Sequence, residues 1–353
     1  MSSSTRTAQP VLPDRIRDVE HLEDVLSLPS PSLVEALSEL GGDVLILGAA
    51  GKMGPTLGAM ARRALDAAGS PGRVIAVSRF SSADGEAWFH RHGVETVRAD
   101  LLDPAQLDAL PSASNVIFMA GMKFGSTGNE PLTWAMNSLL PAMVARRYRG
   151  SRIVAFSTGN IYGLSPVARG GSCECDAPEP LGDYAMSCLG RERMFEHFSR
   201  ADGTPVTLFR LNYATEMRYG VLVDIAHKVW CAEPVDVTMG VLNAVWQGDA
   251  CAMALRSLSV ASSPALALNC AGPEILSVRR IAEQVGEMMG KPVTFEGCEA
   301  TTAGISNGQL GHRLFGYPVV PVQQMLLWIA DWVSRGGASL GKPTHFEVRD
   351  GKF

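Results

Sequence analysis

The feature that most constrains the fold is a short apolar run that leads directly into a glycine-rich turn. Residues 43–48, DVLILG, have the length and character of a buried parallel strand. The turn GAAGKMG contains Gly48, Gly51 and Gly54, and the stretch PTLGAMARRALDAAG after it carries apolar residues at helical spacing. A strand, a tight turn and a helix in this order predict the first unit of a parallel sheet with crossover helices.

Strand-like and helix-like segments continue to alternate as far as Asn212, and this predicts an α/β fold with a Rossmann-type doubly wound parallel sheet. We expect an N-terminal helical extension over residues 1–40 and a dinucleotide-binding domain over residues 41–212. Residues 213–353 are expected to form a smaller, mixed α/β substrate lobe, with room for interleaved strands and helices. The further predicted strands are RVIAVSRF, ETVRAD, NVIFMAG, RIVAFST and VTLFRLN.

The expected N-terminal extension has apolar residues at helical spacing from Ile16 to Leu40, interrupted by LPSPS. Ser32 is expected to cap a helix through LVEALSEL, with Glu35 as its capping-box partner. Such a helix either packs on the main domain or covers a subunit interface, and the sequence leaves both open.

Composition excludes several classes of protein. A formal net charge of −5 provides no basic surface for nucleic acid, and no apolar run approaches the length that spans a bilayer. The N-terminus lacks the apolar core of a signal peptide, so a cytoplasmic location is expected, with the seven cysteines reduced. Only Cys173 and Cys175 lie close together, without further ligands at suitable spacing, so no metal site is expected.

The glycine turn indicates a bound dinucleotide, because glycines let the backbone approach a pyrophosphate and the following helix offers free N–H groups. At the end of the second predicted strand stand Ser78 and Arg79, with no carboxylate before Asp84. A serine leaves room for a 2′-phosphate, and an arginine can bind it with two hydrogen bonds. Lys52 in the turn is a second candidate cation. These residues favour NADP, with NAD as the alternative.

Two further motifs, FSTGNIYG and DYAMSCLGRE, complete a resemblance to the extended short-chain dehydrogenase/reductase superfamily, in particular its nucleotide-sugar epimerase/dehydratase branch. The resemblance covers residues 43–290. It implies that Tyr184 transfers a proton, with Thr158 as the catalytic hydroxyl beside it. Asp100 and Leu101 would approach the adenine, Ala120 and Gly121 the ribose, and Lys123 the cofactor phosphates. The candidate cofactor-binding residues are Gly48, Gly51, Lys52, Met53, Gly54, Ser78, Arg79, Asp100, Leu101, Ala120, Gly121, Lys123 and Asn137.

One departure from the superfamily lies in the catalytic helix, where Cys188 occupies the position of the family's lysine, four residues after Tyr184. That lysine holds the nicotinamide ribose, and its charge favours the tyrosinate. A unit charge at about 5 Å and an effective dielectric near 20 is worth roughly 3 kcal/mol, or about two pKa units. Alcohol oxidation needs the tyrosinate and suffers directly, whereas carbonyl reduction needs the neutral tyrosine. The departure therefore favours a reductase.

Another cation can replace the missing lysine, and Lys123 is the candidate, whereas Arg191 is expected to lie too far along the helix. Cys188 is considered as a nucleophile too, although a small buried thiol is the simpler interpretation. A second departure is RLNYATEMRYG, which lacks the family's Tyr-Gly-Pro ending, so nucleotide-sugar specificity does not transfer.

Three functions follow from these residues. The first is an NAD(P)-dependent oxidoreductase that transfers hydride to or from a carbonyl or hydroxyl carbon of a small or sugar-like substrate. The second is a nucleotide-sugar epimerase or dehydratase with a relocated cation, and the third is a non-catalytic NAD(P)-binding scaffold or sensor. The resemblance also implies a homodimer formed through the helices that carry Asn137 and Tyr184.

Overall fold

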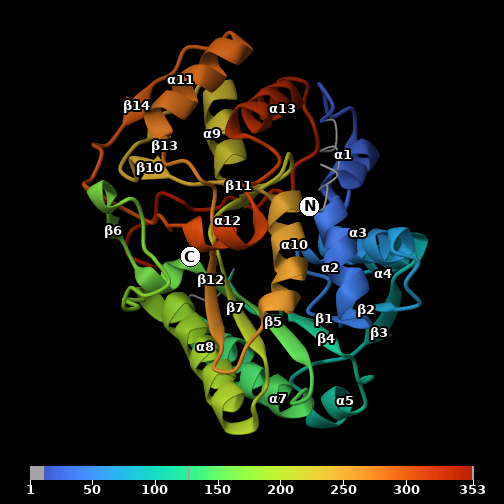
Figure 1. The fold of residues 1–353 in the computed structure, drawn as a ribbon. Coiled ribbons are helices and arrows are strands. Elements are labelled where there is room, and N and C mark those ends of the chain that lie inside the picture. The colour runs from blue at the N-terminus through green and yellow to red at the C-terminus, as the bar shows by residue number, and fades with distance from the viewer. Residues whose placement is uncertain (1–11, 124, 126–127, 352–353) are drawn as a thin grey trace, which may run out of the picture.

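A seven-stranded parallel sheet forms the centre of the computed structural model, which describes residues 12–123, 125 and 128–351 (Figure 1). Its strand order is β12-β7-β5-β4-β1-β2-β3, with every neighbouring pair parallel. The chain reverses its direction of growth between β1 and β4, which is the switch point where doubly wound sheets bind ligands. The strands are β1 (Val44–Leu47), β2 (Val74–Ser78), β3 (Glu95–Arg98), β4 (Asn115–Phe118), β5 (Arg152–Thr158), β7 (Val206–Leu211) and β12 (Leu266–Cys270).

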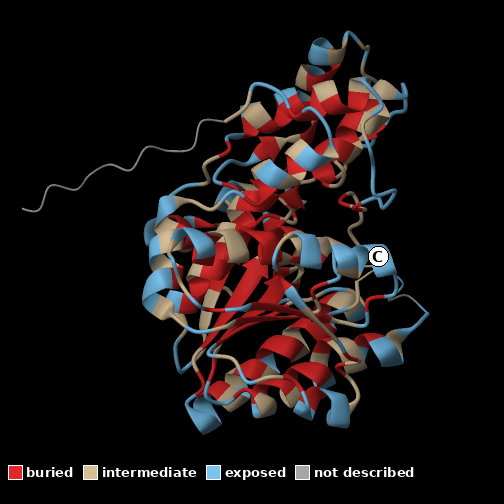
Figure 2. Cartoon of the chain, turned by 90° about the vertical axis from the view of Figure 1, so that its right-hand side faces the viewer, coloured by how far each residue is buried: buried red, intermediate tan, exposed pale blue. Residues whose placement is uncertain are grey.

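Helices cover both faces of this sheet, because successive strand residues point to opposite sides. Val44 and Ile46 of β1 pack toward the face covered by α2, α3, α4 and α10, whereas Leu45 and Leu47 pack toward α5, α7 and α8. Figure 2 shows the buried residues running through the sheet and the inner sides of these helices. The helices are α2 (Pro31–Leu40), α3 (Gly54–Ala67), α4 (Ala83–Arg91), α5 (Pro104–Asp108), α6 (Glu130–Trp134), α7 (Leu140–Arg147), α8 (Gly182–Asp202) and α10 (Gln247–Arg256).

A second lobe lies beside the carboxyl ends of the strands, at the top of Figure 1. Its core is formed mainly by three helices, α9 (Val221–Trp230), α11 (Val278–Met289) and α13 (Val322–Ser334), together with Trp246. The ring centroids of Trp246 and Trp328 lie 5.4 Å apart in this core. The remaining elements are α12 (Gln309–Phe315) and the short strands β6 (Ser165–Pro166), β8 (Ala214–Thr215), β9 (Val235–Asp236), β10 (Val241–Leu242), β11 (Val245–Trp246), β13 (Leu276–Ser277), β14 (Phe295–Glu296) and β15 (Thr302–Ala303).

The described part of the N-terminal extension contains two helices that join different cores. Leu22 and Leu26 of α1 (Val19–Leu26) are fully buried in the core of the second lobe, whereas Leu33 and Leu37 of α2 pack on the sheet domain. The predicted cap at Ser32 is wrong, because Ser30 caps α2 and accepts a hydrogen bond from the amide of Leu33 at 3.3 Å. Pro31 at the first helical position, where no N–H is needed, allows the helix to begin earlier.

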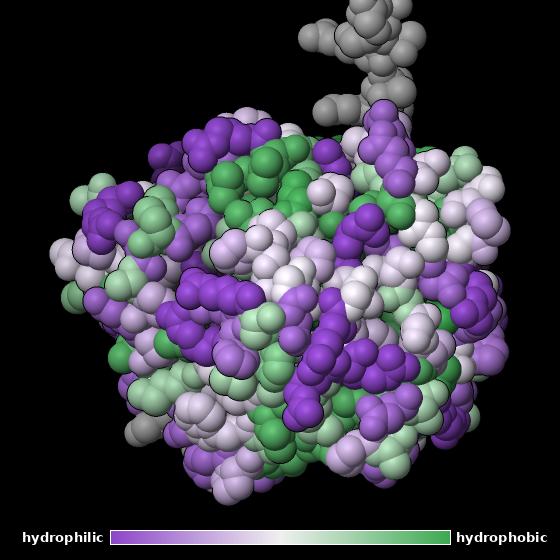
Figure 3. Space-filling model, turned by 60° about the horizontal axis from the view of Figure 1, so that its bottom comes forward, coloured by the Kyte–Doolittle hydropathy of each residue, from purple (hydrophilic) through white to green (hydrophobic). Residues whose placement is uncertain are grey.

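The chain returns to the sheet after Asn212, since β12 pairs with β7 over five residues. The two lobes are therefore interleaved in sequence, and the predicted domain boundaries at 40 and 212 stay predictions. Among the described residues, no helix has the length and apolar character to cross a membrane, and the cytoplasmic location stays a prediction as well. Figure 3 shows one face of the molecule, where hydrophilic residues separate small apolar patches.

Candidate active site

A cavity of about 890 Å³ lies between the carboxyl ends of the sheet strands and the second lobe. One wall comes from the glycine turn, from the end of β5 and from α8. The opposite wall comes from residues 211–221, which connect β7 to α9, and from Leu340, Lys342 and Thr344 near the C-terminus. Tyr184, Thr158, Lys123 and Lys52 all line this one space.

The glycine turn is shaped by two glycines and leaves the third facing the cavity. Gly48 has φ +90°, and a Cβ there would lie 2.5 Å from the amide nitrogen of Ala120. A side chain at Gly54 would collide with the carbonyl of Ala49, whereas one at Gly51 would meet only the carbonyl oxygen of Gly48 at 3.5 Å. The helix α3 begins without a side-chain cap. The Gly54 amide donates to the carbonyl oxygen of Gly51 at 3.1 Å and Pro55 has no N–H, so the backbone of the turn from Ala50 to Met53, which lines the cavity, is the part that faces an anion. This cradle fits a pyrophosphate.

Tyr184 lies on the first turn of α8 and faces Thr158, the last residue of β5. Burial raises the pKa of Tyr184 far above its usual range, and Cys188 adds to the rise, while Arg191 and a hydrogen bond with Thr158 act in the opposite direction. Cys188 is fully buried one turn further on, and burial raises the pKa of its thiol too. The position therefore holds a neutral thiol beside a neutral tyrosine.

Two lysines supply the positive charge of the cavity. The ammonium of Lys123 lies 6.0 Å from the centroid of the Tyr184 ring. The ammonium of Lys52 lies 3.8 Å from the centroid of the Tyr219 ring and donates to the carbonyl of Ala214 at 3.2 Å. Burial lowers the pKa of each lysine to about 8, although nearby acidic groups partly offset this effect. Both are mostly charged at neutral pH and lose that charge in the mildly alkaline range.

A buried network around Asn137 holds α8, the helix that carries Tyr184. Asn137 lies in a π-helical segment, Ala135–Leu139, between α6 and α7. The Oδ1 of Asn137 accepts from the amide of Met122 at 2.9 Å and from Arg191 at 2.7 Å, while its Nδ2 donates to Ser187 at 3.0 Å. Arg191 also donates to the carbonyl of Phe156 at 2.6 Å. Arg191 is thus held by structural contacts, although its charge still lowers the pKa of Tyr184, and it stays a prediction that Arg191 does not replace the missing lysine. A side chain at Gly121 would collide with its guanidinium.

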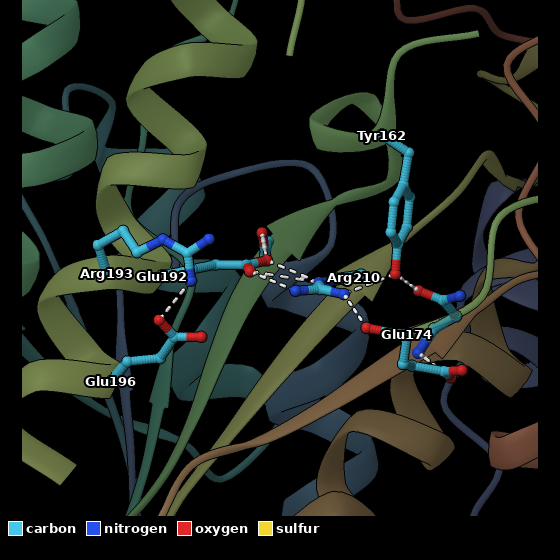
Figure 4. Close-up of polar contacts among 8 residues, drawn as sticks. Tyr162, Glu174, Glu192, Arg193, Glu196 and Arg210 are labelled. Atoms are coloured by element: carbon cyan, nitrogen blue, oxygen red, sulfur yellow. Dashed lines mark hydrogen bonds and ion pairs between the residues drawn. The ribbon is translucent and has the colours of Figure 1, made fainter. Parts of the chain in front are cut away.

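A second buried network fixes α8 against β5 and β7 (Figure 4). Glu192 and Arg210 form an ion pair at 2.7 Å, and Ser157, next to Thr158, donates to Glu192 at 2.5 Å. Arg210 also donates to the Tyr162 hydroxyl at 2.6 Å, and that hydroxyl donates to Asn269 at 2.8 Å. The motif FSTGNIYG and the arginine of RLN therefore belong to one network next to the hydroxyl of Thr158.

Only some of the predicted site residues meet in the cavity. Gly51, Lys52, Met53, Lys123, Thr158 and Tyr184 line it, whereas the other candidates lie outside its lining. Ser78 ends β2, and Arg79 after it is exposed. Asp100 accepts from the amide of Leu102, and Leu101 is buried in the core below the sheet. The candidates outside the lining are Gly48, Gly54, Ser78, Arg79, Asp100, Leu101, Ala120, Gly121, Asn137 and Cys188.

Sequence reasoning did not find the opposite wall of the cavity. Tyr213, Tyr219 and Arg218 lie in the stretch RLNYATEMRYG, which departs from the family pattern and for that reason carried no assignment. Glu23 and Thr344 reach the cavity from the two ends of the chain, and no local pattern marks them. The departure itself was the only available signal.

Comparison with known proteins gives a family match for part of the chain. Residues 44–214 match the family model described as "NAD dependent epimerase/dehydratase family". A search of the curated proteins gave no match. The matched residues hold the glycine turn, Thr158, Tyr184 and the strand that carries Arg210.

Solved structures with the same fold include several enzymes of nucleotide-sugar chemistry. UDP-glucuronic acid 4-epimerase from Bacillus cereus, in complex with NAD, has 16% identity and a TM-score of 0.67, and the match covers 83% of this chain and 99% of that one. MoeE5 in complex with UDP-glucose and NAD has 21% identity and a TM-score of 0.65, with the same coverage. UDP-glucose 4-epimerase from Thermotoga maritima, with UDP-glucose, has 17% identity and a TM-score of 0.67, again with that coverage.

These matches confirm the predicted Rossmann-type fold and the expectation of an NAD-dependent enzyme. The family match begins at Val44, so α1 and α2 precede the matched residues. Residues 44–214 therefore resemble the NAD-dependent epimerase/dehydratase family, in agreement with the resemblance of the sequence motifs.

Proposed function

We propose that this protein is an NAD(P)-dependent reductase that converts a carbonyl group of a small or sugar-like substrate to a hydroxyl. The observation that carries the proposal is the pairing of Tyr184 with a buried thiol, Cys188, where the family has an ammonium. A tyrosine kept neutral is a proton donor and a poor base. The direction that needs a donor is carbonyl reduction.

The chain's own residues account for the proton transfer. Tyr184 and Thr158 would both hydrogen-bond the substrate carbonyl oxygen, and Tyr184 would give up its proton as that oxygen becomes a hydroxyl. The ammonium of Lys123, 6.0 Å from the ring, would stabilise the tyrosinate left behind. The Ser157–Glu192–Arg210 network keeps the end of β5 in place during this step. When bound, the reduced nicotinamide supplies the hydride to the carbonyl carbon.

Residues of the glycine turn would hold the dinucleotide. The backbone of the turn from Ala50 to Met53, open at Gly51, would receive the pyrophosphate, with the Lys52 ammonium beside it. The remaining cofactor candidates (Gly48, Met53, Gly54, Asp100, Leu101, Ala120, Gly121 and Asn137) stay proposals that rest on the resemblance; of these, Met53 lines the cavity.

We propose NADP as the preferred cofactor, with NAD, which is bound in two of the similar structures, as the alternative. Arg79 is exposed directly after Ser78, at the end of β2, where a guanidinium can receive a 2′-phosphate. The double change Ser78→Asp and Arg79→Ala should shift the preference toward NAD, because a carboxylate accepts from the ribose hydroxyl and repels a phosphate.

A second candidate function is a nucleotide-sugar epimerase in which Lys123 supplies the catalytic charge. The position of Lys123 in the same cavity as Tyr184 favours it, as do the epimerases of the same fold. Epimerisation begins with oxidation of a hydroxyl, so it needs the tyrosinate that the buried thiol disfavours. We therefore rank it below the reductase.

A homodimer is proposed from exposed apolar side chains on the helices that the resemblance implicates. Leu132, Trp134 and Leu139 are 42%, 39% and 57% exposed near the start of the α6–α7 stretch, and Met186 on α8 is 46% exposed. Side chains of this kind commonly lie at an interface between subunits. The double change Leu139→Glu and Met186→Glu should convert a dimer to a monomer in analytical ultracentrifugation.

One panel of thermal-shift measurements tests the proposed function. NAD, NADP, their reduced forms and UDP-, GDP- and dTDP-sugars are added one at a time, because a ligand that binds the folded state raises the midpoint. Stabilisation by a reduced dinucleotide and carbonyl turnover, abolished in Tyr184→Phe with binding retained, supports the reductase. Interconversion of a nucleotide sugar would favour the epimerase, and binding of neither dinucleotide would contradict both.

A further inference from the structure

Glu23, on the N-terminal helix α1 and outside the family-matched residues, reaches the wall of the cavity. Its carboxylate is held at both oxygens: Oε2 accepts from the indole N–H of Trp88 at 2.8 Å, and Oε1 accepts from Arg218 at 3.2 Å. Trp88 and Arg218 line the same cavity. The helix that carries Glu23 is anchored by Leu22 and Leu26, both fully buried.

Arg218 is part of a tight turn over residues 216–219, so its contact with Glu23 bears on that turn. Its amide donates to the side chain of Glu216 at 2.8 Å, and its Nε donates to the same carboxylate at 3.0 Å. Glu216 and Tyr219 exchange backbone hydrogen bonds at 3.0 and 3.2 Å, which closes the turn. The amide of Leu340 donates to the carbonyl of Arg218 at 3.0 Å, so a segment near the C-terminus supports the turn as well.

The 216–219 turn contacts Lys52, the lysine of the glycine-rich loop. The ring of Tyr219 lies 3.8 Å from the ammonium of Lys52, which also donates to Ala214 just before the turn. Contacts therefore run without a break from Glu23 through Arg218 and Tyr219 to Lys52.

We propose that Glu23 is a positioning residue that sets Lys52 for the pyrophosphate of the bound dinucleotide. The inference rests on the proposed function, since it assigns Lys52 to that anion. Arg218 has a side chain only 16% exposed, and with the charge of Glu23 gone its guanidinium would be paired with Glu216 alone. The 216–219 turn would then keep only its own backbone hydrogen bonds and the contact from Leu340, and a shift of the turn would move Tyr219 and Lys52 with it.

The charged groups around Lys52 set its pKa, so the proposal predicts a change in the pH dependence of dinucleotide binding. Burial lowers its pKa to about 8, Glu216 in the turn and Cys251 on α10 raise it, and Lys123 and Arg218 lower it further. If the turn moves, Glu216 and Arg218 both move with it, and the effect of Glu216 is the larger of the two. The pKa of Lys52 then falls, and dinucleotide affinity begins to decline at a lower pH.

The experiment compares Glu23→Gln with Asp24→Asn in the full chain, by fluorescence titration with NADPH and NADH between pH 6.5 and 9.5. Glutamine keeps an oxygen for the Trp88 indole but loses the charge that holds Arg218. Asp24 is the matched control, since it is adjacent, exposed and pairs with Arg63. We expect about fivefold weaker binding at pH 7 for Glu23→Gln, the equivalent of ~1 kcal/mol, and a decline that begins at lower pH. Asp24→Asn should match the wild type.

The same change in a Lys52→Met background separates positioning from general damage. If Glu23 acts through Lys52, adding Glu23→Gln to Lys52→Met should weaken binding no further. An equal loss in both backgrounds, or wild-type binding by Glu23→Gln, would overturn the inference while leaving the proposed function intact. If the wild type binds neither NADPH nor NADH, the proposed function fails and the inference fails with it.

Discussion

The two walls of the cavity are built in different ways. The wall that carries Tyr184 and Thr158 rests on two fully buried networks, one around Asn137 and one around the Glu192–Arg210 pair. The opposite wall, residues 211–221, is a connection held by Arg218 and by contacts from the two ends of the chain.

From this difference we infer that the first wall serves catalysis and the second serves ligand binding. Buried networks would rigidify the groups proposed to move a proton, whereas partly exposed ion pairs would set the wall proposed to meet the ligand. Changes in the first wall should therefore reduce catalysis or unfold the protein, and changes in the second should alter binding.

Tyr184→Phe should lower the rate of carbonyl reduction by about 10²–10⁴-fold, because it removes the proton donor. Dinucleotide binding should be unchanged, since the ring and its packing remain. Single-turnover oxidation of NADPH checks the rate, and a fluorescence titration checks binding. Retention of the full rate would remove Tyr184 from the mechanism.

Glu192→Gln should destabilise the fold by about 3–5 kcal/mol, because it leaves the buried Arg210 guanidinium without its counter-charge. Urea unfolding followed by circular dichroism measures the loss. Glu196→Gln, on the same helix, breaks only the half-exposed pair with Arg193 and serves as the control (Figure 4). The control should lose less than about 1 kcal/mol. Equal losses in the free energy of unfolding would mean that the buried pair contributes no more to stability than the half-exposed pair.

Cys188→Lys should lower the pKa of Tyr184 by about two units and increase alcohol oxidation by up to about a hundredfold at neutral pH. Carbonyl reduction should gain much less, because its donor is already protonated. Comparison of kcat/KM in the two directions is the measurement. Cys188→Met fills the site without a charge and controls for packing. The electrostatic account fails if the lysine variant oxidises alcohols no faster than wild type.

Dinucleotide affinity should fall as the pH rises through about 8, where Lys52 and Lys123 lose their protons. Both lysines are cations below that pH and attract the phosphates, so binding is strongest there. Loss of one such charge should weaken binding by about tenfold, or roughly 1.4 kcal/mol. Lys52→Arg, which keeps its charge across this range, should flatten the profile. A profile unchanged by that substitution would contradict the assignment of Lys52.

Ser30→Ala should cost about 1 kcal/mol of the free energy of unfolding, because it removes the side-chain cap of α2. Ser32→Ala should cost much less, since Ser32 lies inside the helix. Thermal unfolding of the two variants distinguishes them, and a larger loss for Ser32→Ala would return the cap to the position that the sequence predicted.

The sequence predicted one wall better than the other because the interactions that form the two walls differ in sequence separation. The strand, turn and helix around Gly48 and the face shared by Tyr184 and Cys188 are local patterns with fixed periods, so they could be read from the chain. The contacts of Glu23 with Arg218 and of Leu340 with the same residue join segments more than a hundred positions apart. No local pattern encodes such contacts. The π-helical segment around Asn137 was likewise hidden inside an ordinary helical pattern.

The most direct test of the account is the ionisation of Tyr184 in the wild-type protein. Tyrosines labelled with ¹³C at Cζ are followed by NMR between pH 6 and 10.5, and Tyr184→Phe identifies the resonance. The account predicts that this resonance keeps the chemical shift of the neutral phenol throughout, because burial and the thiol of Cys188 hold its pKa above the usual range. A titration with a midpoint below about pH 8, well under the ordinary tyrosine value near 10, would show an activated base and contradict it.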